Sequence, residues 1–231
     1  MWLNKEKISN ASISAYRKTL IQNAPNYIVI DDLFNGDKLD EVLKVLQLSS
    51  GWLTQKHSYS ALYVDDMTWL RTRNKQRFVK RDLWQRDAAD TDSSPSNLAL
   101  AFLSFLRSDE FLVLLSRIFR VSLTDINLDK PDLNTNYFRL GASDFVNQHA
   151  DDSPGRQVCM LLYLNKDWQS NNGGELVFMG TEEKHIYIEP QYNRCVLFDP
   201  SSPGAEHWVN ALKAPDSQLY RYNVTSWYWS K

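Results

Sequence analysis

The chain has 231 residues, with 26 basic and 28 acidic side chains, so its formal net charge is −2. This near-balance argues against a protein that is held on nucleic acid or on a membrane by its overall charge. The composition, 43% hydrophobic and 23% charged, is globular and excludes a wholly disordered or collagen-like chain. A chain of this length has room for a sizeable core.

From the sequence we expect neither a signal peptide nor a membrane span. Residues 1–7 carry charge where a signal peptide needs an apolar run, and the longest apolar stretch, residues 98–106, is far shorter than a membrane span. The two cysteines, Cys159 and Cys195, each lie in an apolar run and are expected to be free, buried thiols. We therefore expect a cytoplasmic protein with no membrane segment.

The N-terminal part of the chain favours helix. Apolar residues recur at helical spacing, most clearly between residues 37 and 48, and Ser and Asp stand at helix starts. One short apolar run reads as a buried strand. The expected helices cover residues 12–22, 37–48, 96–106 and 109–119, and the expected strand covers 27–30.

After Val121 the pattern changes to short strands separated by turn residues. Eight such strands predict a barrel or jelly roll. With helices on one outer face of the sheet, the fold class is α+β. We expect one domain, with a helical support region at residues 1–121 and a strand-rich core at 122–231. The expected strands are 134–140, 145–151, 157–165, 175–179, 185–188, 194–198, 206–210 and 219–229.

One short motif carries chemistry. His149 and Asp151 are two residues apart, so in a strand their side chains point to the same face. An imidazole and a carboxylate, joined by a second histidine from a later strand, form a 2-His-1-carboxylate triad that suits Fe(II) and leaves coordination positions open. His207, 58 residues after His149, is the preferred partner. The competitor, His185, lies in a segment that reads as a surface hairpin.

From Asn136 onward the chain resembles the 2-oxoglutarate- and Fe(II)-dependent dioxygenases, and most closely their prolyl 4-hydroxylase-like branch. The resemblance implies that family's double-stranded β-helix, or jelly roll, over about 95 residues. Residues 26–34 resemble the lead strand of the same branch more weakly. The matching residues are 137–141, 149–151, 162–165, Trp168, 173–176, 196–198, 207–209 and 221–227.

The resemblance also implies roles for single residues. His149, Asp151 and His207 would hold the iron, and Arg221 would bind the distal carboxylate of 2-oxoglutarate, with Tyr137 as a second contact or as a core residue. A planar guanidinium suits a carboxylate, because it can bind it through two hydrogen bonds. Many relatives have small hydroxyl residues where Asn223 and Thr225 stand, which leaves their part in the pocket open. Gly173 and Gly174 are expected to make a tight turn with positive φ.

The implied reaction hydroxylates an unactivated C–H bond with Fe(II), 2-oxoglutarate and O₂, releases succinate and CO₂, and can involve ascorbate as reductant. The first choice of substrate is a prolyl residue of a protein or a related amino acid. An alkylated-nucleobase demethylase is the alternative, because residues 221–225 also resemble that branch and the basic stretch 71–86 fits nucleic acid. That stretch reads more simply as a solvated hairpin, and otherwise as a substrate-side loop over the iron that recognises an acidic or nucleic-acid-associated target. A non-catalytic β-barrel binding module is the third hypothesis.

Overall fold

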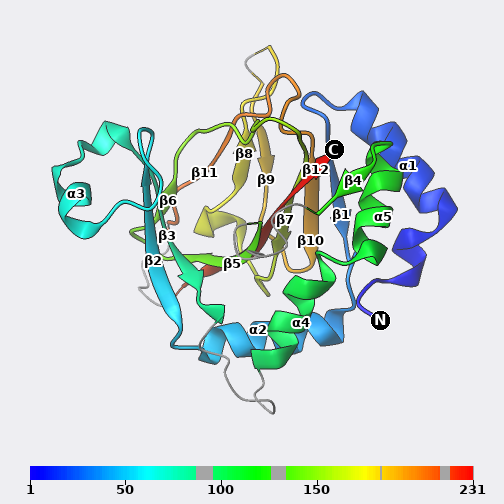
Figure 1. Cartoon of the computed structure of the whole chain (residues 1–231), viewed down its shortest axis with the longest axis horizontal. Helices are drawn as coiled ribbons and strands as arrows, with labels where there is room; N and C mark the ends of the chain where they lie inside the picture. Colours follow the sequence, from blue (N-terminus) through cyan, green and yellow to red (C-terminus); the bar gives the residue numbers. More distant parts are fainter. Residues whose placement is uncertain (87–95, 126–133, 183, 214–218, 231) are drawn as a thin grey trace.

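Two antiparallel sheets form the centre of the protein (Figure 1). Its structure, a computed structural model, describes residues 1–86, 96–125, 134–182, 184–213 and 219–230. The large sheet has nine strands, seven of them in the order β1-β10-β7-β12-β5-β3-β2, with β4 added to β12 and β6 to β3. The small sheet has three strands in the order β11-β8-β9.

The strands have the following bounds, given in chain order. The large sheet contains β1 (Tyr27–Asp31), β2 (Trp52–Ser58), β3 (Arg77–Trp84), β4 (Leu123–Thr124), β5 (Thr135–Leu140), β6 (Phe145–Val146), β7 (Arg156–Tyr163), β10 (Arg194–Phe198) and β12 (Arg221–Ser230). The small sheet contains β8 (Leu176–Phe178), β9 (Ile186–Ile188) and β11 (His207–Val209).

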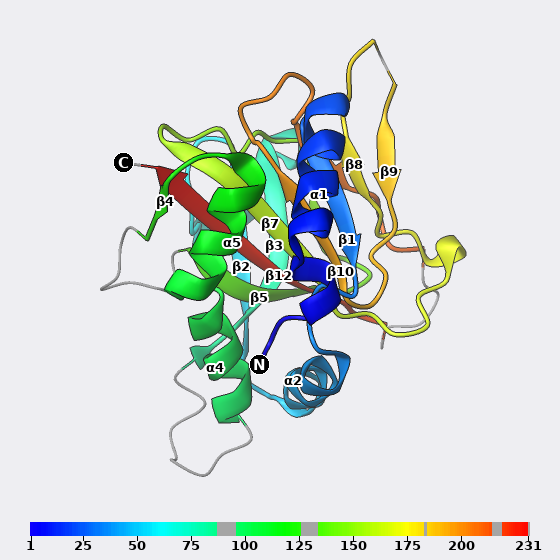
Figure 2. The same cartoon turned by 90° about the vertical axis from the view of Figure 1, so that its right-hand side faces the viewer.

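The helices lie along one face of the large sheet and beyond its ends. They are α1 (Asn10–Gln22), α2 (Gly36–Leu48), α3 (Asp66–Arg71), α4 (Ser96–Phe105) and α5 (Asp109–Phe119), with 3₁₀ turns at Lys5–Ile8, Asn74–Gln76 and Ser170–Asn172. Figure 2 shows α1 and α5 side by side over the large sheet, whereas α3 projects at the opposite end of the molecule in Figure 1. None of the helices among the described residues is long and apolar enough to cross a bilayer.

Side-chain caps and apolar spacing explain the helices. The Asn35 side chain accepts a hydrogen bond from the backbone of Lys38 at the start of α2, which satisfies an N–H that the helix itself leaves free. Four apolar residues of α2 at helical spacing are buried, as the sequence predicts, and pack against the large sheet and α4. They are Leu39, Val42, Leu43 and Leu46.

The two faces of the large sheet have different neighbours. One face packs against the helices in an apolar cluster that contains Val224 and Tyr228 of β12. The other face meets the small sheet, where Tyr163 of β7 and Phe198 of β10 pack on Phe178 of β8. Side chains in a strand alternate between faces, so β12 contributes to both. The fold is therefore the predicted α+β jelly roll, with helices on one outer face.

The region at residues 1–121 does more than the expected helical support, because it adds three strands to the large sheet. β1 pairs with β10 at one edge, and the hairpin of β2 and β3 continues the sheet beyond β5. β2 and β3 were not among the expected strands. Within the basic stretch 71–86, residues 77–84 form the hairpin strand β3, which is half-buried in the sheet rather than solvated, whereas Arg71, Arg73 and Lys75 precede this strand and are exposed.

Candidate metal centre and cosubstrate pocket

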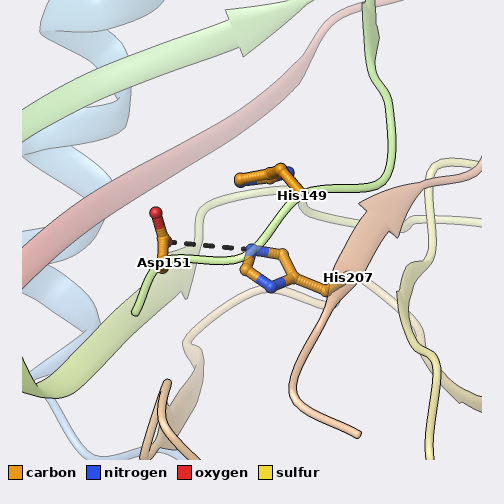
Figure 3. A group of neighbouring side chains, drawn as sticks. All are labelled: His149, Asp151 and His207. Atoms are coloured by element: carbon orange, nitrogen blue, oxygen red, sulfur yellow. Dashed lines mark ion pairs between the residues drawn. The ribbon is translucent and has the colours of Figure 1, made fainter. Parts of the chain in front are cut away.

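The three predicted ligand residues come together between the two sheets (Figure 3). Their ligand atoms all lie within 4.8 Å of one another. The imidazole rings of His149 and His207 have centroids 4.4 Å apart, and His207 Nε2 lies 3.9 Å from Asp151 Oδ2. Two nitrogens and a carboxylate at this separation are a donor set that fits Fe(II).

A short backbone bridge, rather than a long strand, places the two histidines opposite each other. β6 ends at Val146, so the expected strand over 145–151 is shorter than predicted. His149 and His207 instead form an isolated antiparallel bridge, in which each backbone N–H donates to the other's carbonyl at 3.0 Å. The bridge fixes two ligands that are 58 residues apart in sequence.

Hydrogen bonds to the backbone select the tautomer of both imidazoles. Nδ1 of His149 lies 2.9 Å from the carbonyl oxygen of Asn147, and Nδ1 of His207 lies 3.0 Å from that of Ala205. A neutral imidazole that donates from Nδ1 leaves the Nε2 lone pair for a metal. Burial, with a smaller contribution from the neighbouring His149, lowers the pKa of His207 to about 4, so this ring is neutral at neutral pH.

Asp151 is held by three neighbours. Trp227 Nε1 donates to Oδ2 at 2.9 Å, and Arg156 Nη1 donates both to Oδ1 at 3.2 Å and to the backbone oxygen at 2.7 Å. The Cys159 thiol lies 3.8 Å from Oδ2. Burial opposes ionisation, but the positive charges around the carboxyl group and the Trp227 hydrogen bond outweigh it and hold the pKa of Asp151 below its usual value. The carboxylate is thus ionised and oriented for a cation.

Arg221 is almost fully buried, with 1% of its side chain exposed, and it is incompletely satisfied. Nε donates to the Gly174 carbonyl at 2.7 Å and Nη1 to Asn223 Oδ1 at 3.0 Å. Nη2 is buried with no hydrogen-bond partner among the described residues, and the same holds for the hydroxyl of Tyr163, whose ring centroid lies 4.8 Å from the guanidinium carbon. Two unpaired buried donors in one place fit a carboxylate ligand.

The turn that carries Gly174 has the expected backbone. Gly173 and Gly174 have φ values of +72° and +75°, in the left-handed region that glycine adopts at low cost. A Cβ atom on Gly174 would lie 3.1 Å from Arg221 Cδ and 2.8 Å from Leu212. The glycine therefore also makes room for the close approach of Arg221.

Tyr137 does not reach this pocket. It lies on the helix-facing side of β5, fully buried, and its hydroxyl donates to the Ala99 carbonyl at 2.8 Å. Tyr137 is therefore a core residue, as one of the two interpretations held. The tyrosine that faces Arg221 is Tyr163. His185 is exposed on the β8–β9 hairpin, where its ring packs 5.0 Å from Trp208, away from the triad.

Sequence reasoning missed several residues that line the site. An outer pocket of about 700 Å³ opens onto His149 and Asp151, and a small inner cavity continues to Arg221 and Asn223. Trp227 could have been found, because it continues the every-second-residue row of Arg221, Asn223 and Thr225 in β12. The others come from β2, β3 and the β2–α3 connection, and they include His57, Tyr59, Phe78 and Arg81. Phe78 and Arg81 belong to the basic stretch 71–86, for which a loop over the iron was one interpretation, whereas no local pattern indicates a role for His57 or Tyr59.

Comparisons with known proteins agree with this geometry. Residues 135–229 match the family model described as the 2OG-Fe(II) oxygenase superfamily. A curated relative, the prolyl 3-hydroxylase OGFOD1 of Mus musculus, is 23% identical over 154 residues, which are 64% of this chain and 27% of the relative. The chain thus spans about a quarter of the length of that relative.

Two solved structures share the fold over almost the whole chain. A Pseudomonas putida prolyl-4-hydroxylase is 15% identical with a TM-score of 0.61, covering 95% of this chain and 99% of its own. A Trichoplax adhaerens prolyl hydroxylase, solved with a peptide fragment of hypoxia inducible factor, is 20% identical with a TM-score of 0.62, covering 96% and 94%. The predicted jelly roll is confirmed, and the family match over residues 135–229 agrees with the predicted resemblance to the 2-oxoglutarate- and Fe(II)-dependent dioxygenases.

Proposed function

We propose that this chain, whose residues 135–229 match the family model of the 2OG-Fe(II) oxygenase superfamily, is a dioxygenase that hydroxylates an unactivated C–H bond of a prolyl residue or a related amino acid. Members of the superfamily require Fe(II), 2-oxoglutarate and O₂. The observation that carries the proposal is the joint placement of the His149, Asp151 and His207 ligand atoms within 4.8 Å and an incompletely satisfied Arg221 in the adjoining cavity.

The three side chains would hold the iron from one side. Bound there with 2-oxoglutarate and O₂, the iron supplies the oxidising chemistry, which gives the hydroxylated product, succinate and CO₂. Nε2 of His149 and of His207 would donate their lone pairs, while Asp151 would supply negative charge. Trp227 and Arg156 hold the carboxylate in place through their hydrogen bonds.

Arg221 would bind the distal carboxylate of 2-oxoglutarate through Nη2, with the Tyr163 hydroxyl as a second donor. Burial lowers the pKa of Arg221, but a guanidinium starts from so high a value that it stays charged. The row Arg221–Asn223–Thr225 is linked by hydrogen bonds of 3.0 and 2.9 Å, so its members are oriented before any ligand arrives. A charged group that is already desolvated binds its carboxylate more strongly than it would in water.

The outer pocket supports an amino-acid substrate. Its walls include the rings of Tyr59, Phe78 and Trp227, which suit a compact apolar ring next to the metal. The curated relative named a prolyl 3-hydroxylase and the neighbour solved with a peptide fragment support the same class. The stretch 71–86 lends the nucleobase alternative little support, because its strand residues are engaged within the sheet. We further propose that the chain forms one oxygenase domain.

The test is conversion of 2-oxoglutarate to succinate by the purified protein with Fe(II), ascorbate and O₂. Proline-containing peptides, free amino acids and methylated oligonucleotides are compared as stimulants. We expect succinate release that depends on Fe(II) and that increases when peptides or amino acids are added. The peptide or amino acid should become heavier by one oxygen atom. Absence of succinate under every condition would favour the non-catalytic binding module, and formaldehyde release from oligonucleotides would favour the demethylase.

A further inference from the structure

The outer pocket contains a cation that the proposed chemistry does not use. Arg81 of β3 lines both the outer pocket, with His149 and Asp151, and the inner cavity, with Arg221. It therefore lies where the two spaces meet. Its guanidinium carbon stacks 3.5 Å from the ring centroid of Phe138, and Nε donates to Gln55 Oε1 at 3.1 Å. These two contacts fix the plane and direction of the group.

The terminal nitrogens of Arg81 are free, in contrast to those of most partly buried arginines. Neither makes a hydrogen bond to a described residue, and no carboxylate of the described chain lies within 4.0 Å of the group. Four other partly buried arginines have a carboxylate within ion-pair distance: Arg107 has Asp125, Arg139 has Asp82, Arg156 has Asp151 and Arg194 has Asp31. Of the three arginines that line the outer pocket and the inner cavity, Arg81 and Arg221 have no carboxylate partner among the described residues, whereas Arg156 is paired with Asp151.

The charge of Arg81 needs an external partner. Desolvation lowers its pKa to about 10 and Asp151 partly opposes this, so the group is still protonated at neutral pH. The carboxylate of Asp151 is already shared with Arg156, Trp227 and the proposed metal. A half-buried cation without a counter-charge is costly, and a planar fork with two free nitrogens fits a carboxylate best.

We propose that Arg81 binds a carboxylate of the substrate and so selects substrates with an acidic group close to the hydroxylated carbon. This inference rests on the proposed function, since it assigns the outer pocket to the substrate. The carboxylate has two chemical sources. It is either an Asp or Glu side chain of a peptide next to the modified residue, or the α-carboxylate of a free amino acid.

The experiment measures binding rather than turnover. The protein is loaded with Mn(II) and 2-oxoglutarate and titrated calorimetrically with matched probes. One arm compares a proline-containing peptide that has Asp beside the proline with the same peptide carrying Asn. The other arm compares free L-proline with L-prolinamide. We expect the wild type to bind the acid of one pair about tenfold more tightly or better, as for a charged hydrogen bond in a desolvated site.

Three variants make the test specific. Arg81→Met keeps an unbranched side chain without the charge and should abolish the preference for the acid, and Arg81→Lys should retain part of it. The matched control is Lys80→Met, which removes one positive charge from the same strand. Lys80 lies on the opposite face of β3, where it pairs with Asp144 at 3.0 Å. It should leave the preference unchanged. Thermal unfolding verifies that every variant is folded.

The outcomes separate the inference from the proposed function. If wild type binds Mn(II) and 2-oxoglutarate but shows no acid preference, or if Arg81→Met retains it, the inference is wrong and the proposed function stands. If Arg81→Met loses affinity for 2-oxoglutarate instead, the arginine serves the cosubstrate and the inference is also wrong. If wild type binds neither Mn(II) nor 2-oxoglutarate, the inference is rejected together with the proposed function. The arm that shows the preference identifies the source of the carboxylate.

Discussion

The two faces of β12 are both buried, but they are built from different kinds of residue. Toward the helices, Val224 and Tyr228 are fully buried in a cluster of apolar side chains that pack against one another. Toward the small sheet, Arg221, Asn223 and Thr225 are 1%, 4% and 6% exposed and form a polar row. An apolar face gains stability by burial alone, whereas a buried polar row is costly unless each group has a partner. The free Nη2 of Arg221 therefore points to a ligand rather than to the fold.

The largest expected effect on turnover comes from removing a charge on the side of the large sheet that faces the small sheet. Asp151→Ala should abolish 2-oxoglutarate turnover while the protein stays folded, because the metal loses its anionic ligand and the apolar face is untouched. Succinate release, metal content and thermal unfolding check this. Asp152→Ala is the matched control, since its side chain is an exposed neighbour. A variant that keeps half of the wild-type turnover would remove Asp151 from the proposed ligand set.

The converse change acts on the helix-covered side. Phe102 of α4 is fully buried, with its ring centroid 5.2 Å from that of Phe34. Phe102→Ala should lower the free energy of unfolding by ~3–5 kcal/mol through the cavity it leaves. Below the unfolding transition, the KM for 2-oxoglutarate should match that of the wild type. Denaturant titration and kinetics measure both, with Val113→Ala on α5, a residue 56% exposed, as control. A large change in KM would mean that the two faces are coupled.

A subtler change on the polar side keeps the charge but alters its shape. Arg221→Lys replaces a planar fork by a point charge, at a loss of about 1.5–3 kcal/mol for charge-assisted hydrogen bonds. We expect the KM for 2-oxoglutarate to rise about tenfold or more. Steady-state kinetics give the result, and Arg194→Lys, which alters an arginine paired with Asp31 outside the pocket, serves as comparison. An unchanged KM would show that another residue anchors the cosubstrate.

The smallest expected effect comes from a residue that touches a proposed ligand but not the metal. Trp227→Phe removes the hydrogen bond to Asp151 and should weaken metal binding about tenfold, as is usual for partners of metal ligands. Trp229→Phe is the matched control, because Trp229 stacks on Arg156 at 5.1 Å without that hydrogen bond to Asp151. Metal titration gives both dissociation constants. Equal constants for the two variants would contradict a positioning role for Trp227.

Local patterns predicted what depends on local geometry. The apolar spacing of α2 and the His149-x-Asp151 pair could be read from neighbouring residues, and the resemblance located His207 and Arg221. β3 escaped prediction because its charged residues find partners far away in sequence, such as Arg139 for Asp82 and Phe138 for Arg81. The position of Tyr137 depends on which face of β5 turns to the helices. That choice is made by packing, which a single strand does not encode.

The order of the large sheet has a consequence for solubility. The family match starts at β5 and ends within β12, so it contains β10, β7, β12 and β5 but none of the N-terminal strands. β1 covers the free side of β10, and β3 covers that of β5. A fragment limited to residues 135–229 would expose two rows of unpaired backbone groups, one of them along the apolar strand β10. Such edges recruit other chains, so this fragment should aggregate where the full chain stays dispersed.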